Sequence, residues 1–351
     1  MLTSIDTPAV IVDLDVAERN IARFQDHCTR HGLGLRPHIK THKLPQLAAR
    51  QMTAGAVGIT CQKIGEAEVM AQAGMTDIFI TYNIVGEAKM ARLRRLARGC
   101  RLSVVADNDA VVIGLSSGFA DEPRPLEVLI ECDTGAGRCG VQTPGEALAL
   151  ARTIAAGPGL RFGGLMTYRP SGDQAEVDRW LIEAREALRG EGLACPRIST
   201  GGSPNMWHCQ TVTAATEHRA GVYVYNDRMQ LRAGACTVED CALSVLATVV
   251  SRPTATRAVL DAGSKVLTSD QFGLDGFGLV ADHPEARVAG LSEEHGVLDL
   301  SATSWRPQVG DRVRVIPNHA CVVSNMVDSV WAVRGTDVEG ALPVAARGCV
   351  A

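Results

Sequence analysis

Three side chains whose types suit catalysis lie toward opposite ends of this 351-residue chain. Lys40 belongs to residues 36–43 and follows a short apolar segment, and His319 and Cys321 belong to residues 317–321. Imidazole and thiolate are soft ligands, and one residue between them on an extended segment lets both reach the same metal ion. The two segments therefore indicate a reactive amine and a metal pair.

Lys40 is expected at the carboxyl end of a strand, where a barrel enzyme displays its catalytic groups. Residues two apart on a strand point the same way, so His38 and Lys40 would share the barrel-facing side. Burial lowers the pKa of a lysine and makes it a nucleophile that can form a Schiff base. With a metal pair, such a lysine suggests pyridoxal phosphate chemistry. The alternative is that Lys40 lies past the strand end as a solvated loop lysine. Lys43 is expected to start a helix and to be a surface charge.

Two glycine-rich segments could hold parts of a cofactor. Residues 133–141 place Arg138 between glycines, where its guanidinium could cross the barrel mouth; a salt-bridged surface arginine is the alternative. Residues 199–203 follow the seventh expected strand, where barrels commonly build a phosphate site from backbone N–H groups. Gly221 and Tyr223 could close the same cup. A plain Gly-Gly turn is the alternative there.

The metal pair is incomplete by itself. Two protein ligands leave a divalent metal short of its usual four, so water or substrate would complete the shell, as in a catalytic site. The thiolate favours zinc over manganese or magnesium. Chance pairs of this kind are frequent in a chain with nine histidines and eleven cysteines.

The elements that must position these residues follow one rhythm, in which short apolar runs alternate with stretches of helical period. The sequence predicts eight strands, at 35–40, 57–62, 77–82, 102–106, 128–133, 162–168, 196–200 and 220–225. Helices are expected at 65–73, 87–98, 144–155 and 176–188. Eight such units predict an α/β fold with a (β/α)8 barrel. An open doubly wound sheet is disfavoured because no G-x-G-x-x-G lies between a strand and a helix.

After about residue 231 the pattern changes to strand-like segments separated by turns. We therefore expect a cofactor-binding barrel over residues 16–231, and a β domain with the metal ligands over residues 1–15 and 232–351. The apolar run at 9–14 could add a strand to that β domain.

Composition excludes several classes of function. The net charge is −4 and 21% of residues are charged, so no basic face for nucleic acid is evident. No apolar run reaches the roughly 20 residues that a membrane span needs. The eleven scattered cysteines form no disulfide framework, and no signal peptide precedes the first strand, so we expect reduced thiols in a cytoplasm.

Taken together, these motifs resemble the D-threonine aldolase and D-serine dehydratase family, whose barrel is shared with the alanine racemase N-terminal domain. The resemblance runs from Thr7 to Cys321. Its most specific parts are residues 36–43 and 317–321, and residues 61–68 and 223–230 are further family-like runs.

The resemblance implies a fold-type III enzyme that uses pyridoxal 5′-phosphate and a divalent metal (zinc, manganese or magnesium). Lys40 would carry the cofactor, with His38 as a second catalytic residue, and His319 and Cys321 would hold the metal. The remaining cofactor contacts would be Gln62, Arg138, Tyr168, Thr200, Gly201, Gly202, Ser203, Gly221 and Tyr223. A homodimer is expected by analogy.

The resemblance leaves the reaction open between two lyases. A D-threonine aldolase-like enzyme would cleave a D-β-hydroxy amino acid to glycine and an aldehyde. A dehydratase acting on D-serine or D-3-hydroxyaspartate would give a keto acid and ammonia, and Cys321 is more typical of that branch. An amino-acid racemase and a non-catalytic cofactor carrier are further alternatives. Arg169 stands where many relatives have a histidine-containing run, and could bind a second substrate carboxylate or point outward.

Overall fold

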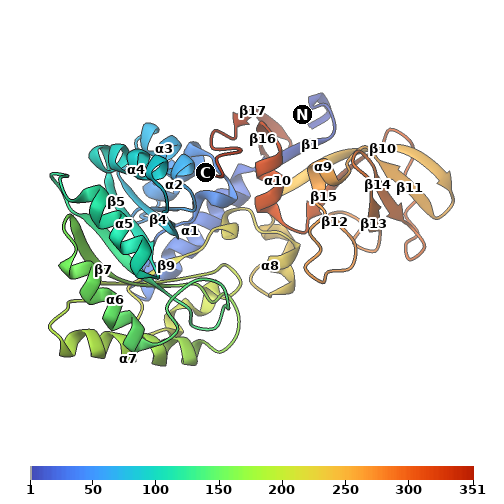
Figure 1. The fold of residues 1–351 in the computed structure, drawn as a ribbon. Helices are drawn as coiled ribbons and strands as arrows, with labels where there is room; N and C mark the ends of the chain where they lie inside the picture. Colours follow the sequence, from blue (N-terminus) through green and yellow to red (C-terminus); the bar gives the residue numbers. More distant parts are fainter. Residues whose placement is uncertain (1) are drawn as a thin grey trace. The chain divides into compact units, whose positions relative to one another are not determined.

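Strands and helices alternate from residue 34 to residue 219 of the computed structural model, which describes residues 2–351 (Figure 1). The chain divides into two units. The barrel unit comprises Arg23–Lys40, Pro45–Gly221 and Cys349–Ala351, and the β unit comprises residues up to Ala22, Thr41–Leu44 and Val222–Gly348. Helix α1 (Leu14–Arg30) contributes residues to both.

The barrel unit is built on eight parallel strands in the order β2-β9-β8-β7-β6-β5-β4-β3. A parallel bridge between His38 and Thr60 joins the two ends of this order. This confirms the predicted barrel fold. The strands are β2 (Gly34–Leu35), β3 (Ile59–Cys61), β4 (Asp77–Asn83), β5 (Arg101–Ala106), β6 (Leu126–Cys132), β7 (Leu160–Thr167), β8 (Arg197–Gly201) and β9 (Glu217–Arg219).

Helices follow these strands, and successive helices from α3 to α7 pack against one another around the sheet (Figure 1). They are α2 (Pro45–Thr53), α3 (Ile64–Gln72), α4 (Glu87–Gly99), α5 (Asp109–Phe119), α6 (Pro144–Ala156) and α7 (Gln174–Gly190). Local signals fix their starts: Asn108, Thr143 and Asp173 each accept a backbone N–H as N-cap residues. The four predicted helices therefore match the observed ones to within two residues.

Two predicted strands differ from the structure. The chain leaves strand geometry after Leu35, and residues Ile39–Thr41 form a 3-10 helix, η2. Pro37 has no N–H to continue a strand ladder, which accounts for the early end. The last barrel strand is Glu217–Arg219, and residues Val222–Val224 form another 3-10 helix, η4. The three residues of β9 are charged or polar, so a search for apolar runs misses this strand.

The interior of the barrel combines an apolar layer with a network of charges. Phe79, Val105, Leu129 and Met166 form the apolar cluster. Arg36 Nε donates to Glu217 at 3.0 Å, and Arg197 lies 3.1 Å from Glu127. Burial alone would raise the pKa of the Glu217 carboxyl, but Arg36 and Arg197 outweigh it and lower that pKa. The amino-terminal end of the barrel is thus closed by paired charges.

The β unit is a nine-stranded sheet in the order β11-β14-β13-β12-β15-β10-β1-β16-β17. Strand β1 (Ala9–Asp13) lies between β10 and β16, antiparallel to the first and parallel to the second. The other strands are β10 (Leu243–Thr254), β11 (Arg257–Leu260), β12 (Gly278–Val280), β13 (Arg287–Leu291), β14 (Gly296–Asp299), β15 (Arg312–Pro317), β16 (Ser329–Arg334) and β17 (Asp337–Pro343). Short helices α8 (Arg228–Arg232), α9 (Ser264–Leu267) and α10 (Ala320–Met326) complete the unit. No helix within residues 2–351 is long and apolar enough to cross a membrane.

We predict that replacing Arg36 destabilises the barrel far more than replacing an exposed arginine. Arg36→Met removes the buried guanidinium that pairs with buried Glu217 and partly buried Asp77, and breaking a buried pair costs about 3–5 kcal/mol of unfolding free energy. Arg30→Met is the control, because Arg30 pairs with Asp26 on the surface and its side chain is 63% exposed, against 4% for Arg36. That exposed pair is worth at most about 1 kcal/mol. Urea unfolding of both variants measures the difference, and equal losses would contradict a supporting role for Arg36.

Candidate functional site

Lys40 lies in the 3-10 helix η2, half-buried, rather than on a strand. The expectation that His38 and Lys40 lie on one strand and share its barrel-facing side is therefore wrong. Instead, the backbone N–H of Lys40 donates to Nδ1 of His38 at 3.4 Å. The tight turn brings the main-chain N–H of Lys40 to the imidazole ring of His38.

The ring of His38 is held from both sides. Because Nδ1 accepts the N–H of Lys40, Nε2 carries the proton and donates to Oε1 of Gln62 at 3.1 Å. Gln62 in turn donates to the carbonyl of Thr81, and its own N–H donates to Glu66. With both ring nitrogens engaged, the geometry gives His38 a positioning task next to Lys40.

Lys43 is buried, so the expectation of a surface lysine is wrong. Its side chain is 5% exposed and Nζ donates to the carbonyl of Ala346 at 3.3 Å, within the β unit. The positive φ of 56° at Lys43 turns the chain so that the amine is directed inward.

Arg138 lies on a loop that a single carboxylate organises. Asp133 accepts the N–H groups of Gly135, Ala136 and Gly137. Burial alone would raise the pKa of Asp133, but these three donors outweigh it and lower that pKa. The Arg138 guanidinium lies 4.9 Å from the ring centre of Tyr168, so the structure brings these two predicted cofactor contacts together.

Arg138 also approaches a buried acid. Its Nη2 lies 3.6 Å from Oε1 of Glu131, whose side chain is buried. Burial raises the pKa of Glu131, and Arg138 offsets only part of this rise. Arg138 thus retains an exposed side that a bound anion can use.

Arg169 connects two loops at the carboxyl end of the barrel. It donates to the carbonyl of Thr134 at 2.6 Å and pairs with Glu176 at 3.0 Å. Cβ atoms at Gly135 or Gly172 would lie about 3 Å from its guanidinium. Arg169 is therefore a clamp between the loop that carries Arg138 and the start of α7, rather than an outward-pointing side chain.

The candidate phosphate cup consists of Thr200–Ser203 and Gly221, all in the barrel unit. Ser203 Oγ accepts the N–H of Gly221 at 3.2 Å, which joins the two segments. Gly202 has a φ of 135°, and a Cβ there would come within 2.7 Å of Pro170. Only glycine fits this backbone and leaves the cradle open. Tyr223, the further predicted member, lies buried in η4 of the β unit.

His218, which the sequence analysis did not identify, organises this cup. Its Nε2–H donates to the carbonyl of Gly202 at 3.0 Å, and Nδ1 accepts the Thr200 hydroxyl at 3.1 Å. Since C=O and the next N–H point in opposite directions across a trans peptide, the N–H of Ser203 is directed away from His218. Burial lowers the pKa of His218 to about 4, so the ring is neutral. The signal in the sequence was the charged triplet Glu217-His218-Arg219 beside an apolar run.

His319 and Cys321 lie at the start of α10, in the β unit. His319 is the N-cap residue, and its interaction with Cys321 shows that the two side chains meet. Burial alone would lower the pKa of His319, but contacts with Cys321 and Asp270 raise it to about 9. Cys321 Sγ lies 3.3 Å from the hydroxyl of Thr41, the residue after Lys40 in the chain. Among residues 2–351, no cluster of three histidine, cysteine or acidic side chains suits a metal.

Asp227, which belongs to the family-like run 223–230 but was not predicted as a site residue, anchors the segment that carries the predicted metal ligands. One carboxylate oxygen accepts the N–H of Ala320 at 2.9 Å, and the other caps α8 through the N–H of Gln230. Burial raises the pKa of Asp227 to about 6, although these donors oppose the rise. One carboxylate therefore fixes the start of α10 against α8.

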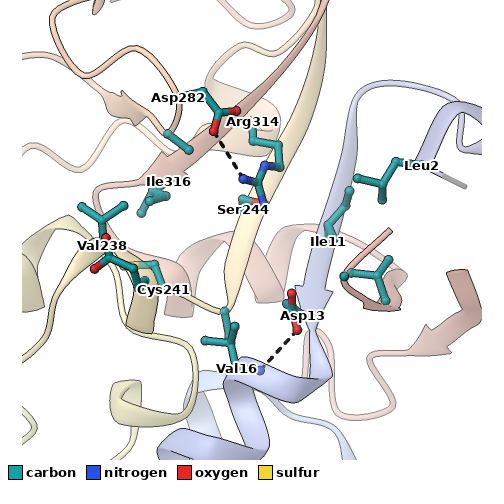
Figure 2. Close-up of a pocket in the computed structure, with 15 residues that line it drawn as sticks. Leu2, Ile11, Asp13, Val16, Val238, Cys241, Ser244, Asp282, Arg314 and Ile316 are labelled. Carbon is teal, nitrogen blue, oxygen red and sulfur yellow. Dashed lines mark hydrogen bonds and ion pairs between the residues drawn. The ribbon is translucent and has the colours of Figure 1, made fainter. Parts of the chain in front are cut away.

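A cavity of about 280 Å³ lies elsewhere, on the sheet of the β unit (Figure 2). Its lining includes Asp13, Ser244 and Ile316, with Arg314 paired to Asp282 at 3.6 Å. Asp13 accepts the N–H of Val16 there, at the start of α1. None of the predicted site residues lines this cavity.

The chain is similar to known proteins over nearly its whole length. Residues 12–229 match the model for the alanine racemase N-terminal domain, and residues 242–333 match a model for a serine dehydratase domain. D-threonine aldolase from Arthrobacter sp. is 35% identical over 99% of this chain and 94% of its own length. D-threo-3-hydroxyaspartate dehydratase from Delftia sp. (strain HT23) is 36% identical over 91% of this chain and 92% of its own.

A solved structure of an enzyme with one of these names has a closely similar fold. The crystal structure of D-threonine aldolase from Filomicrobium marinum aligns with a TM-score of 0.91 and 35% identity, covering 100% of this chain and 98% of the other. These findings confirm the predicted family. Aldol cleavage and dehydration, the two reactions left open by the sequence, both occur among relatives at similar identity.

We predict that His218 contributes to loss of stability in acid. Between pH 6.5 and about 4 the unfolded chain binds a proton at this ring that the folded chain does not, so stability falls as pH falls through that window. The shift corresponds to about 3 kcal/mol. His218→Gln keeps a donor and an acceptor but does not titrate, so its unfolding free energy should fall by about 3 kcal/mol less over this window.

Urea unfolding from pH 7 to pH 4 measures this slope. His208→Gln is the control, because His208 lies ten residues upstream on the exposed side of η3 (Met206–Thr211). It should keep the wild-type slope. If His218→Gln also keeps it, the ring is not neutral in the folded protein.

Proposed function

We propose that this chain, which belongs to the D-threonine aldolase and D-serine dehydratase family of alanine racemase-like pyridoxal phosphate enzymes, cleaves a D-β-hydroxy amino acid to glycine and an aldehyde. The substrate class rests on relatives that bear the names of aldolases and of a dehydratase. The reaction would need pyridoxal 5′-phosphate and a divalent metal.

The residues of the barrel unit fit the cofactor. A cradle that a Cβ at Gly202 would fill suits a phosphate, and the end of Asn205 lies beside it with Oδ1 buried and unpartnered in the described chain. Rotating that amide would present N–H donors to an anion. Lys40 would hold the cofactor aldehyde, and Arg138 its ring oxygen or nitrogen. Bound pyridoxal phosphate supplies an electron sink for charge that develops at the substrate Cα.

The chain's own groups would then orient and move protons. His38, fixed by Gln62, holds the main chain of Lys40 in place. Arg169 keeps the Arg138 loop against the start of α7. In the dehydratase alternative, Nζ of Lys40 would remove the proton from the substrate Cα.

His319 and Cys321 fit one divalent metal, because an imidazole and a thiolate are borderline-soft donors that favour zinc. A metal held there lowers the pKa of a coordinated hydroxyl group. The substrate β-hydroxyl is the group that both reactions activate. Two protein ligands leave a divalent metal short of its usual four, so a position would remain for that hydroxyl.

One observation carries the proposal: the contact of Thr41 with Cys321 at 3.3 Å. Thr41 is joined to Lys40 by a single peptide bond. Chain continuity therefore links the residue proposed to carry the cofactor to a residue proposed to hold the metal. A non-catalytic cofactor carrier has no use for such a pair, and a racemase needs an acid or base on each face of the ring rather than a metal.

The dehydratase is the second candidate. Cys321 favours it, since the thiolate is typical of that branch of the family, and the Delftia dehydratase is as similar as the Arthrobacter aldolase. The two reactions use nearly the same residues and differ in which substrate bond breaks.

Product analysis distinguishes these candidates. We expect the protein, supplied with pyridoxal phosphate, zinc or manganese, and D-threonine or D-3-hydroxyaspartate, to release glycine and an aldehyde. Ammonia with a keto acid would establish the dehydratase instead. Turnover of the L-isomers alone would overturn the substrate class.

We predict that Lys40→Ala abolishes the Schiff-base absorbance of the protein with its cofactor, because no other amine would be positioned to replace it. Lys63→Ala is a demanding control. Lys63 also follows a barrel strand, with Nζ 3.6 Å from the ring centre of Tyr82. If the absorbance is lost in Lys63→Ala and kept in Lys40→Ala, the cofactor is bound to Lys63 and the assignment to Lys40 is wrong.

We further propose a homodimer in the cytoplasm. All eleven cysteines are free thiols, which suits a reducing compartment. The dimer rests on analogy with barrel enzymes of this type, and sedimentation of the purified protein would measure it.

A further inference from the structure

The ring of His319 has contacts that assign its two nitrogens. Nδ1 lies 3.0 Å from Oδ2 of Asp270, and a carboxylate can only accept, so Nδ1 carries the proton. When the ring binds a metal, the lone pair of Nε2 is therefore the one available to it. The ring of Phe272 stands edge-on to His319, with ring centres 5.2 Å apart. The imidazole is held both in tautomer and in rotation.

Asp270 and Phe272 belong to a loop, residues 268–276, that is tied down along its length. The fully buried Asn318, next to His319, donates to the carbonyls of Asp270 and Gly276 at 2.9 and 3.0 Å. Arg228 Nη1 donates to Oδ1 of Asn318 at 2.7 Å. The loop and the ligand segment are therefore fixed to each other by a buried amide.

Two arginines of α8 complete the attachment of this loop. Arg228 Nη2 donates to the carbonyl of Asp275, and Arg232 Nη1 to that of Phe272. Thr268 and Phe272 adopt positive φ values of 65° and 48°, which residues with side chains rarely do. Such conformations persist where the surroundings over-determine them, and they gather at functional sites.

Asp270 is a partner of the ring rather than a third metal ligand in this proposal, because it meets His319 at Nδ1 and leaves Nε2 for a metal. Histidines that bind metals commonly donate their other N–H to a carboxylate, which orients the ring and raises its basicity as a ligand. Thr41 gives Cys321 a comparable partner. Each residue of the metal pair thus has one supporting group.

We propose that Asp270 is a positioning residue that holds His319 with Nδ1 protonated and Nε2 directed to the metal, with Phe272 fixing the ring's rotation. The inference rests on the proposed function, since it requires a metal at His319 and Cys321.

The test measures metal affinity rather than turnover. Cobalt is titrated into chelator-treated, cofactor-loaded protein against a competing dye, and the visible cobalt bands report the coordination. Asp270→Ala should bind cobalt about 10- to 100-fold more weakly than wild type, with shifted bands. Asp270→Asn should lose less, because an amide oxygen still accepts the Nδ1 proton.

Asp275 provides the matched control. It lies in the same loop, its carboxylate pairs with Arg287 and is 76% exposed, and it does not contact His319. Asp275→Ala and Asp275→Asn should bind cobalt as the wild type does. Unchanged cofactor absorbance and unfolding midpoint in the Asp270 variants would show that the fold is intact.

The outcomes separate the inference from the proposed function. If His319→Ala loses cobalt but Asp270→Ala and Asp270→Asn bind it as wild type does, the positioning role is wrong and the metal pair stands. If wild type and His319→Ala bind cobalt equally, the metal assignment itself fails and the inference falls with it.

Discussion

Arg36 ties together strands from both edges of the barrel sheet. Its guanidinium contacts Glu217 on β9 and Asp77 on β4, on either side of the bridge where the ring of strands closes. Gly58 makes room for it, since a Cβ there would overlap Arg36 Nη1. Pro37, His38 and Lys40 follow directly, so the charged base of the barrel determines where the candidate lysine emerges. Loss of this one guanidinium would free the segment on which the chemistry depends.

Three imidazoles share one structural task around the candidate site. His38 and His218 have both ring nitrogens in hydrogen bonds, and the proposed role of His319 fixes its tautomer in the same way. In each case a main-chain group or a carboxylate determines which nitrogen carries the proton. Reactive or binding groups then sit beside a ring that is already oriented, which reduces the reorganisation that binding would need.

The sequence was sufficient for the barrel, the family and the helix starts, because these depend on local signals: apolar runs, capping residues such as Thr143 with Pro144, and short motifs. It failed at β9, where buried Glu217 pairs with Arg36 and Arg197 and buried Arg219 donates to polar oxygens of neighbouring strands. His218 and Asp270 were missed for a related reason. Their partners lie 16 to 49 residues away along the chain, so no local pattern marks them. The roles assigned to Lys40, Arg138 and Cys321 remain predictions.

Strand β1 precedes the barrel strands in the chain, but both of its neighbours in the sheet follow them. It pairs with β10 and, through Ile11 and Trp331, with β16. The barrel strands all lie between residues 34 and 219, so the ribosome releases a whole barrel while β1 still awaits both neighbours. Pairing across so long a stretch of chain is slow. His319 and Cys321 lie between β15 and β16, within this late segment, so the proposed metal ligands are synthesised only after every barrel strand.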